Sequence, residues 1–460
     1  MTHDDSATPP HWRGYPLFEA LHGRRSRRVG IGNRVPGPLA HHTDAEPVPL
    51  TEEEEAVLAF AACGFTGPAL SDLDLAPDGA ATMMSGLQGR TVSSLDAIQA
   101  VAVVVTNDEA TYLLRRPADL APAEVARLGE LSAARDYVGL ARASRVRLRD
   151  GRARPDADPG QNVALNRWGL HAPGSSYFLP INDLTYAYIN VLLEVLAEHS
   201  GWFIVDERRS FLPAGLAGFA RRKGGHLDDD PAAGRTVTIE AFERSLGELL
   251  SVEQGMVAQN LGLACEALGL GGYTNFAGFD APWFQELGFR MASMPASRFL
   301  GMAAPLRLLL RLRQDPPVHY PLGLETTDGE VLLRSYAPPY FPSMRAAVEA
   351  VVQRKLGPDG IYRGRVGEGA WQDPAAIGTG ISAISNEAVA ATVAYCEYVA
   401  ERYGRFPAYI PPFRAVCGFQ AQHLDTAFYD RYYRPEALPE QHRRHFSSEL
   451  HGDDAPADRA

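Results

Sequence analysis

The sequence predicts an α+β fold, built from both helices and β-strands. Residues 98–105 are rich in β-branched side chains and almost free of polar ones, which predicts a buried strand. A turn at 107–110 and a second short strand at 111–115 follow, so we expect these strands to form a hairpin. Apolar residues within 252–268 recur at the spacing of one helix face, which predicts a long amphipathic helix.

Length and composition indicate a globular protein with at least one large core. The chain has 460 residues, of which 45% are hydrophobic and 22% charged, and this length allows two or three domains. Its formal net charge of −12 argues against a nucleic-acid or anionic-membrane partner, because both bind basic surfaces. Lysine occurs only at Lys223 and Lys355, so an isolated arginine carries little information.

The sequence shows no sign of export or membrane insertion. The first thirty residues lack the apolar segment of a signal peptide, and no stretch reaches the roughly 18 apolar residues that a spanning helix needs. The four cysteines lie far apart without a CxxC pair, which predicts neither a disulfide framework nor a zinc site. We therefore expect a cytoplasmic protein with no bound metal.

Two helices are predicted before the hairpin. Residues 1–14 are polar and contain proline, so we expect a loose N-terminus. Residues 16–23 predict a short helix. Thr51 begins a longer helix that ends near Gly64, because Glu54 stands three residues after Thr51 in capping-box spacing.

The middle of the chain predicts an insertion and further core elements. Residues 118–160 alternate charged and small apolar residues, which predicts helices on a variable insertion followed by a loop. Residues 183–199 predict a helix and 202–205 a strand. The helix over 252–268 is expected to end at Gly269, which suits a helix C-cap and begins a glycine-rich turn.

The C-terminal third is predicted to be mainly helical. Apolar residues with helical spacing lie over 344–356 and 389–400, and glycines follow both segments. From about Pro435 to Ala460 the sequence is charged and rich in histidine and proline, without apolar periodicity. We expect this last segment to be a flexible tail.

A cluster of arginines stands out in this acidic chain. Arg24, Arg25, Arg27 and Arg28 surround Ser26 just after the first predicted helix. Guanidinium groups bind phosphate oxygens through paired hydrogen bonds and the hydroxyl can add another, so the cluster suits a phosphomonoester. The alternative is a solvated basic face. Judged from these five residues alone, that alternative is favoured over a phosphate site.

Two further segments could approach a planar ligand. Ser93 and Ser94 precede the buried strand, where small hydroxyl residues let a flat ring come close but also form ordinary turns. Gly271 and Gly272 follow the long helix, where glycines permit close backbone approach but also serve helix capping. Taken alone, the serines are explained as part of an ordinary turn, and the glycines as part of a helix cap.

The remaining motifs do not predict a site. Residues 30–33 and 378–381 lack the full GxGxxG spacing of a dinucleotide-binding loop. His442 and His445 have a spacing that could hold a metal, but they lie in the polar tail beside two arginines. His423 could be oriented by the carboxylate two residues later, at 425, although a purely structural pair is the simpler interpretation.

Taken in order, these segments resemble the nitroreductase superfamily of FMN enzymes. That family has an Arg-x-Ser-x-Arg/Lys motif after its first helix, then a helix ending in small residues, then a Gln-Asn-Leu-x-Leu-x-x-x-Ala-Leu-Gly-Leu-Gly helix. Residues 24–28, 56–64 and 258–271 match these motifs, the third most closely. Residues 89–97 are similar to the Arg-x-x-Pro-Ser-Ala-Gly-Ala segment of the branch with azoline-oxidising dehydrogenases, with Val92 replacing proline. The Pro-Ser-Ser-x-Asn-x-Gln-Pro-Trp segment of common nitroreductases is missing after Gly64.

The resemblance covers about residues 16–115 and 180–330 and implies how the chain is organised. The implied fold is a mixed, mainly antiparallel sheet flanked by helices, with the long helix near a large interface of a homodimer. The expected parts are a loose N-terminus (1–14), an FMN-binding domain (15–330) with an insertion (118–160), a helical C-terminal extension packed on the core (331–435) and a flexible tail (436–460).

The resemblance also implies a function. It implies an enzyme that passes hydride equivalents from NAD(P)H through FMN to a small organic acceptor, with ping-pong kinetics. No catalytic acid, base or nucleophile is expected, because the flavin carries the chemistry. Carried over by position, the residues near FMN are Arg24, Ser26 and Arg28 at the phosphate and ribityl chain with Arg25 adjacent, Ser93 and Ser94 at the ring, and Gly271 and Gly272 at its far edge. The alternatives are a flavin-free binding or assembly protein of this fold, and a flavin-dependent dehydrogenase of peptide or natural-product maturation.

Overall fold

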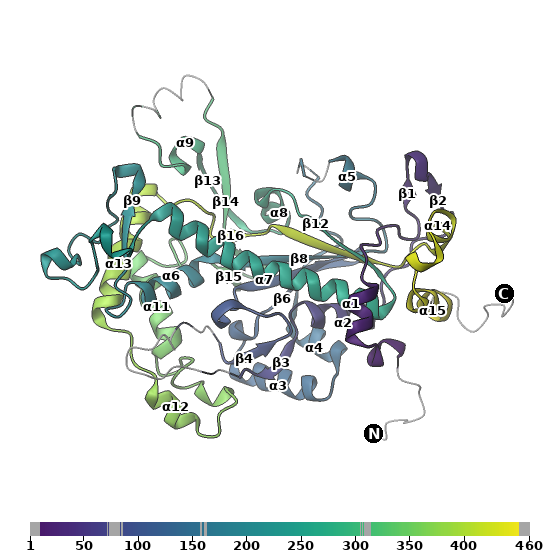
Figure 1. Ribbon diagram of the computed structural model, residues 1–460, viewed down its shortest axis with the longest axis horizontal. Coiled ribbons are helices and arrows are strands. Elements are labelled where there is room, and N and C mark those ends of the chain that lie inside the picture. The colour runs from purple at the N-terminus through teal and green to yellow at the C-terminus, as the bar shows by residue number, and fades with distance from the viewer. Residues whose placement is uncertain are drawn as a thin grey trace.

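The computed structural model describes residues 10–70, 72, 83, 86–156, 159–160, 163–303, 305, 307 and 314–449. A central sheet, seen nearly edge-on in Figure 1, runs through the molecule, and the long helix α7 (Ile239–Leu268) lies along it. The first and last described α-helices, α1 and α15, lie at the same side of the molecule (Figure 1).

A seven-stranded sheet forms this centre. Its strands follow the order β12, β17, β8, β5, β6, β7, and β16 also pairs with β8. Every one of these pairs is antiparallel, which confirms the predicted α+β class with a mainly antiparallel sheet. In chain order the strands are β5 (Val101–Thr106), β6 (Ala110–Leu114), β7 (Arg145–Asp150), β8 (Ser176–Asp183), β12 (Gly271–Phe276), β16 (Phe413–Arg414) and β17 (Cys417–Gln422).

The predicted hairpin is confirmed, since β5 pairs with β6 through a turn. Alternate residues of β5 face two different apolar clusters. Val103 and its neighbours at 101 and 105 pack with α2 (Glu52–Cys63) and α7, whereas Val104 and the alanine at 102 pack with Trp283. Because helices cover both faces of the sheet, this strand is apolar without alternation.

Local signals place the two helices that matter most for the site. Thr51 and Glu54 form the predicted capping box at the start of α2. The helix α7 ends as predicted at Gly269, which adopts a left-handed φ of 82°. It starts at Ile239, well before the predicted 252. Buried apolar residues recur at helical spacing in this earlier part: Ile239, Phe242, Leu246 and Leu250.

The other elements surround the sheet and α7. The remaining α-helices are α1 (Leu17–Gly23), α3 (Pro122–Ala133), α4 (Tyr137–Ser144), α5 (Ala164–Arg167), α6 (Leu184–Val195), α8 (Asp280–Glu286), α9 (Ala296–Phe299), α11 (Met344–Leu356), α12 (Pro374–Gly380), α13 (Asn386–Tyr403), α14 (Thr426–Tyr432) and α15 (Glu440–Glu449). The smaller sheets contain β1 (Arg34–Val35), β2 (His41–His42), β3 (Phe65–Pro68), β4 (Gln88–Arg90), β9 (Phe203–Asp206), β10 (Leu212–Pro213), β11 (Thr236–Thr238), β13 (Arg290–Pro295), β14 (Pro317–Glu325) and β15 (Val331–Arg334).

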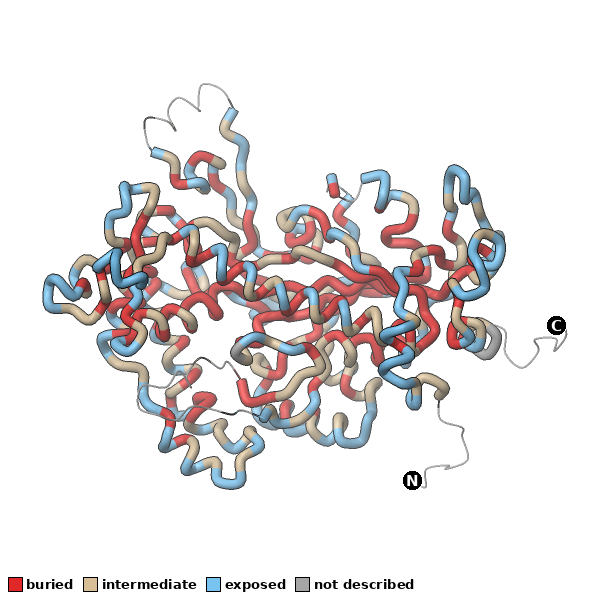
Figure 2. The backbone as a smooth tube through the Cα atoms, in the orientation of Figure 1, coloured by how far each residue is buried: buried red, intermediate tan, exposed pale blue. Residues whose placement is uncertain are grey.

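Buried residues form a continuous band along the sheet and α7, with exposed residues at the periphery (Figure 2). A separate apolar cluster joins α6, α11 and α13 to the N-terminal half of α7. The helices predicted over 16–23, 183–199, 344–356 and 389–400 are therefore confirmed, and all but α1 pack into this second cluster.

The C-terminal third is mainly helical, as predicted, but it also contributes a strand to the central sheet that was not predicted. The strand β17 lies between β12 and β8 in the central sheet. Its polar side chains conceal it in the sequence, but they are satisfied internally: Gln420 donates to the Gly169 carbonyl at 2.8 Å and Gln422 donates to the Arg28 carbonyl at 2.6 Å. The insertion over 118–160 likewise has its predicted helices but ends in β7, which was not predicted.

Part of the segment expected to be a flexible tail is helical. The structure has helix α15 there, and it contacts α7. Its buried residues include Gln441, His442 and His445 rather than aliphatic ones, so no apolar periodicity marked the helix in the sequence. Residues 450–460, and residues 1–9 of the expected loose N-terminus, lie outside the described part. None of the described helices is both long enough and apolar enough to cross a membrane.

Candidate functional site

The segments that match the nitroreductase motifs meet along α7. On this helix the Asn260 side chain donates to the Thr91 carbonyl at 3.0 Å, which joins the third motif to the segment before β5. The helices α1 and α2 also contact α7. A side chain at Gly262 would lie 3.6 Å from Arg24, so the arginine segment passes close to the same helix.

These contacts surround a groove with a volume of about 330 Å³. It is lined by residues of α1 and the segment before it, of α2, of the segment before β5 and of α7: Tyr15, Leu17, Ala20, Ala61, Thr91, Asn260, Leu263, Ala264 and Ala267. Most of these side chains are apolar, and several are small. The groove can therefore accept a flat ligand against α7.

The arginine segment divides into one buried and several accessible side chains. Arg27 is buried and forms an ion pair with Glu266 of α7 at 2.7 Å. Burial raises the pKa of Glu266, and the charge of Arg27 opposes that rise. In contrast, Arg24, Arg25 and Ser26 are exposed. Within the described residues Arg24 forms no ion pair, so its guanidinium is available to an anion.

Arg28 is half-buried and only partly satisfied. Its guanidinium lies 4.5 Å from the ring centre of Tyr273 and donates to the Leu165 carbonyl at 2.8 Å. Its Nε atom is buried and has no hydrogen-bond partner in the described structure. Burial raises the pKa of Tyr273 to about 12, so this phenol stays neutral beside the cation.

Ser93 and Ser94 lie nearer the N-terminal end of α7 than the arginine segment does. Ser93 is exposed, while the Ser94 hydroxyl donates to Glu253 and accepts from the Gln99 backbone at 2.8 Å. Glu253 precedes Gly262 by nine residues, which separates the two contacts by roughly 13 Å along the helix axis. The structure therefore does not bring the serines next to the arginines.

Gly271 and Gly272 lie beside the arginine segment, but side chains of the protein itself pack against them. They belong to the buried first half of strand β12 rather than to a glycine-rich turn. A Cβ atom at Gly271 would lie 2.3 Å from Leu424, and one at Gly272 would lie 2.6 Å from Phe419. Packing against these side chains explains both glycines, so they give no independent support for a ligand.

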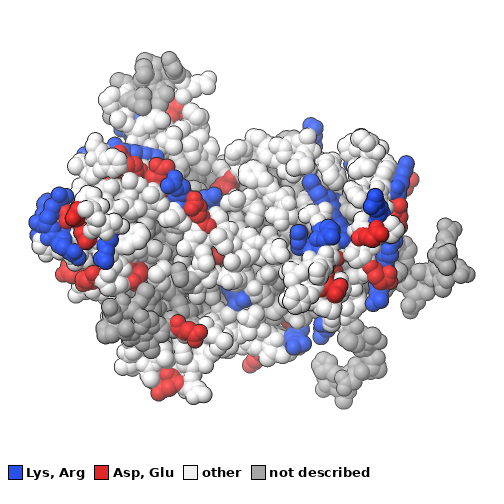
Figure 3. All heavy atoms as spheres, in the orientation of Figure 1, with Lys and Arg blue, Asp and Glu red and all other residues white. Residues whose placement is uncertain are grey.

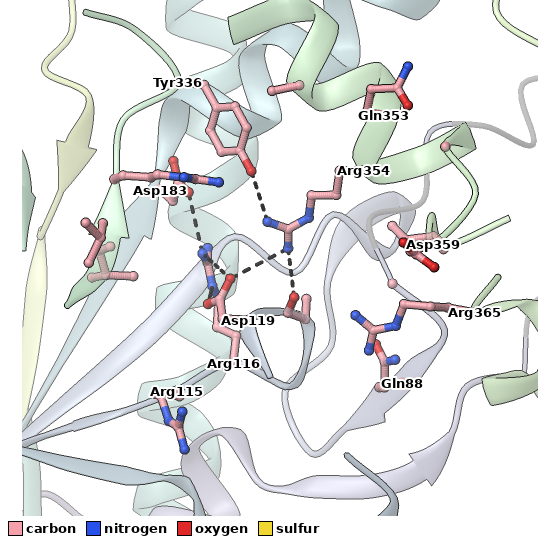
Figure 4. A pocket seen from close by; sticks show the side chains of 18 of the residues that line it. Gln88, Arg115, Arg116, Asp119, Asp183, Tyr336, Gln353, Arg354, Asp359 and Arg365 are labelled. Carbon is pink, nitrogen blue, oxygen red and sulfur yellow. Dashed lines mark hydrogen bonds and ion pairs between the residues drawn. The ribbon is translucent and has the colours of Figure 1, made fainter. Parts of the chain in front are cut away.

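A larger cavity, of about 690 Å³, lies elsewhere in the molecule (Figure 4). It is bordered by β15 and α11 and by the segments around 86–88, 115–119 and 357–368. None of the predicted site residues lines it, and no motif in the sequence pointed to it.

The charges of this cavity are largely matched. Arg116 binds Asp119 through contacts of 2.6 and 3.1 Å and lies 3.5 Å from Asp183 (Figure 4). Arg354 donates to the Tyr336 hydroxyl at 3.1 Å. Although burial acts against it, the neighbouring guanidinium groups lower the pKa of Asp119. Arg116 and Arg354 are therefore already paired with groups of the protein.

The histidines are arranged differently from the sequence-based interpretation. His423 does not pair with Asp425, which instead contacts His41 at 2.8 Å. His423 and His445 both face Glu54, whereas His442 faces Glu266. His442 and His445 therefore do not face a common point, as a metal held by that pair would require.

Comparisons with known proteins add little to this geometry. No protein-family model and no curated protein matches the chain. Among solved structures, the chain is similar to a crystal structure described as a "putative nitroreductase" from Ralstonia eutropha JMP134. The identity is 15% and the TM-score 0.27, over 61% of this chain and 79% of the other. A likeness at this level supports no conclusion about cofactor or activity.

Proposed function

We propose that this chain is an FMN-dependent oxidoreductase that passes hydride equivalents from NAD(P)H to a small organic acceptor. The observation that carries the proposal is the groove along α7. Its walls come from the second and third nitroreductase-like motifs and from the segment before β5, and the first motif passes beside it. Segments separated by more than two hundred residues thus converge where the resemblance requires a common ligand.

The arginine segment fits the phosphate of FMN. Arg24, Arg25 and Ser26 are exposed next to α7, and the buried Nε atom of Arg28 lacks a partner. Figure 3 shows Lys and Arg side chains gathered on the face that carries α1, although the protein as a whole is acidic. An anion held there would gain charge-assisted hydrogen bonds.

In this proposal the chain positions a flavin and shields it from water. Bound FMN would supply the hydride chemistry itself. The apolar side chains of Leu263 and Ala264 would cover the ring, and Asn260 would keep the segment with Thr91 in place. The serines and glycines predicted for the ring have weaker structural support than the arginines.

We further propose that a second copy of the chain completes the groove. The helix α1 exposes large apolar side chains, with Leu17 61% exposed, Phe18 73% and Leu21 45%. On α7, Val252 is 42% exposed and Gln259 is exposed on the same side. Such apolar surface next to a groove is typical of an interface, and a twofold homodimer would cover it in both copies.

Arg24→Ala and Arg28→Ala are each expected to weaken FMN binding about tenfold to a hundredfold. Each removes a charge-assisted interaction with the phosphate worth roughly 1.5–3 kcal/mol. Titration of FMN into the purified protein, followed by flavin fluorescence, measures the change.

Riboflavin and a distant arginine provide the controls. Riboflavin lacks the phosphate, so its affinity should barely respond to either substitution. Arg443→Ala removes a half-exposed ion pair with Asp430 and should affect neither ligand. Equal losses for FMN and riboflavin would show that the arginines support the fold instead. Protein that shows no response to FMN would favour the flavin-free alternative.

Phe18→Glu is expected to convert a dimer into a monomer, because it places a charge in the proposed interface. Light scattering should give about twice 50.0 kDa for the wild type and 50.0 kDa for the variant. Leu212→Glu, at an exposed position on β10, is the matched control and should stay dimeric. A wild-type mass of 50.0 kDa throughout the micromolar range would contradict the dimer.

A further inference from the structure

Three buried side chains from distant parts of the chain face one another beside α7. They are Glu54 of α2, His423 just after β17, and His445 of α15, each at most 5% exposed. One ligand atom from each lies within 4.8 Å of the other two. The two imidazole Nε2 atoms are each 3.1 Å from the same carboxylate oxygen, Oε1 of Glu54.

The hydrogen bonds around Glu54 leave this oxygen without another donor. The capping box at the start of α2 uses Oε2, which accepts from the Thr51 backbone at 2.6 Å and from its hydroxyl at 2.9 Å. In the described structure, the two imidazoles are therefore the only hydrogen-bonding or ion-pair partners of Oε1.

The tautomer of His423 makes this arrangement unfavourable without a cation. Its Nδ1 atom lies 3.0 Å from the Val48 carbonyl, which can only accept, so Nδ1 carries the proton. In the neutral ring Nε2 then presents a lone pair to a carboxylate oxygen. Two lone pairs at 3.1 Å repel each other unless a proton or a metal ion lies between them.

His445 faces the same oxygen, but no neighbour fixes its tautomer. Neither of its ring nitrogens has a hydrogen-bond partner, although both are buried. Its ring stacks on that of His423 with centroids 5.3 Å apart, which turns both Nε2 atoms toward Glu54. A neutral His445 with its proton on Nε2 can face the carboxylate, but the lone pair of His423 Nε2 then still opposes the same oxygen unless that ring is charged. One divalent ion satisfies all three groups at once.

We propose that Glu54, His423 and His445 bind a divalent transition-metal ion, and that this ion fastens the C-terminal helix to the core. Two imidazoles and a carboxylate without a thiolate are a ligand set that zinc accepts. Zinc–ligand bonds of about 2.0–2.2 Å in a tetrahedral shell place neighbouring ligand atoms roughly 3.3 Å apart. Each imidazole Nε2 lies 3.1 Å from Glu54 Oε1, close to that spacing, and the three side chains would fill three of the four positions. The Nδ1–H donation of His423 to a carbonyl is the support that metal-bound histidines usually have.

The position of the site indicates a structural role. The three ligands join α2, the end of the central strand β17 and α15, and they are closed off from solvent. Metal binding to a folded chain stabilises it, because the unfolded chain does not preserve the ligand geometry. This inference is independent of flavin binding.

The test uses full-length protein purified without a histidine tag, stripped with a chelator and returned to zinc. Elemental analysis after dialysis is expected to find one zinc per chain, and zinc should raise the thermal midpoint of unfolding. Glu54→Gln, His423→Gln and His445→Gln should each weaken zinc binding at least about a hundredfold, because even loss of a supporting contact costs 10–100-fold. His442→Gln is the matched control, since it is buried on the same helix but faces Glu266.

X-ray absorption of the zinc-loaded wild type keeps the proposal testable if a variant fails to fold. It should show only nitrogen and oxygen neighbours, with the outer-shell pattern of two imidazoles. A wild type that retains no zinc would overturn the proposal, and so would a sulfur ligand. Unchanged zinc binding in the Glu54, His423 or His445 variants would overturn it as well.

Discussion

Arg27→Met is expected to destabilise the folded protein by about 3–5 kcal/mol, the usual cost of breaking a buried ion pair by removing one partner. Arg27 is 4% exposed and its partner Glu266 2% exposed. The guanidinium also donates to the Ala437 carbonyl at 2.9 Å and to the Gly23 carbonyl at 3.2 Å. Its loss leaves the buried Glu266 with only the more distant His442, at 3.9 Å, and urea unfolding of the purified protein measures the effect.

Two comparisons separate the loss of the ion pair from nonspecific destabilisation of the fold. Arg25→Met changes an exposed neighbour and should alter the free energy of unfolding by no more than about 0.5 kcal/mol. Adding Glu266→Leu to Arg27→Met should recover part of the loss, because the buried charge is then removed as well. If Arg27→Met unfolds at the same urea concentration as Arg25→Met, the ion pair does not stabilise the fold.

Glu243 is expected to stabilise the folded protein more at pH 5 than at pH 8. Between these pH values the free energy of unfolding of the wild type should fall by about 2–3 kcal/mol more than that of Glu243→Gln. This carboxyl group on α7 is fully buried, and burial raises its pKa to about 7. A group whose folded pKa exceeds its unfolded value stabilises the protein below the unfolded pKa. That contribution is lost as the pH rises through about 7.

Several groups around Glu243 hydrogen-bond to its carboxyl group or affect its pKa. It accepts from the backbone of Ala408 and Tyr409, each at 2.6 Å, and from Ile410 at 3.1 Å. The Tyr188 hydroxyl donates at 3.2 Å, and the charge of Arg405 opposes the rise in pKa. Urea unfolding at several pH values gives the free energy for both proteins. Parallel curves for wild type and variant would show that Glu243 does not titrate in this range.

Local signals in the sequence were sufficient for several elements. The capping box of Thr51, the left-handed glycine at 269 and the β5–β6 hairpin depend on residues that are neighbours in the chain. The apolar run of β5 also predicted burial, because only a strand covered on both faces has such a composition. These features are decided by short-range geometry, so they can be read before the fold is known.

The candidate site was only partly predictable. The motif segments were visible as sequence, but their convergence on one groove depends on how α1, α2 and α7 pack. Nothing in the sequence distinguished buried Arg27 from its exposed neighbours, because burial depends on Glu266, which lies 239 residues away. The charged cavity was missed for the same reason, since its walls come from separate segments.

The sequence by itself determined the α+β class, the main helices and the hairpin, since these depend on periodicity and capping. Tertiary structure alone decided that β17 enters the central sheet and that α15 packs on α7, because both elements bury polar side chains whose partners are distant. It also decided that Glu54, His423 and His445 meet. Hydrogen bonds and ion pairs between such distant residues leave no periodic pattern in a sequence, so only the folded chain shows them.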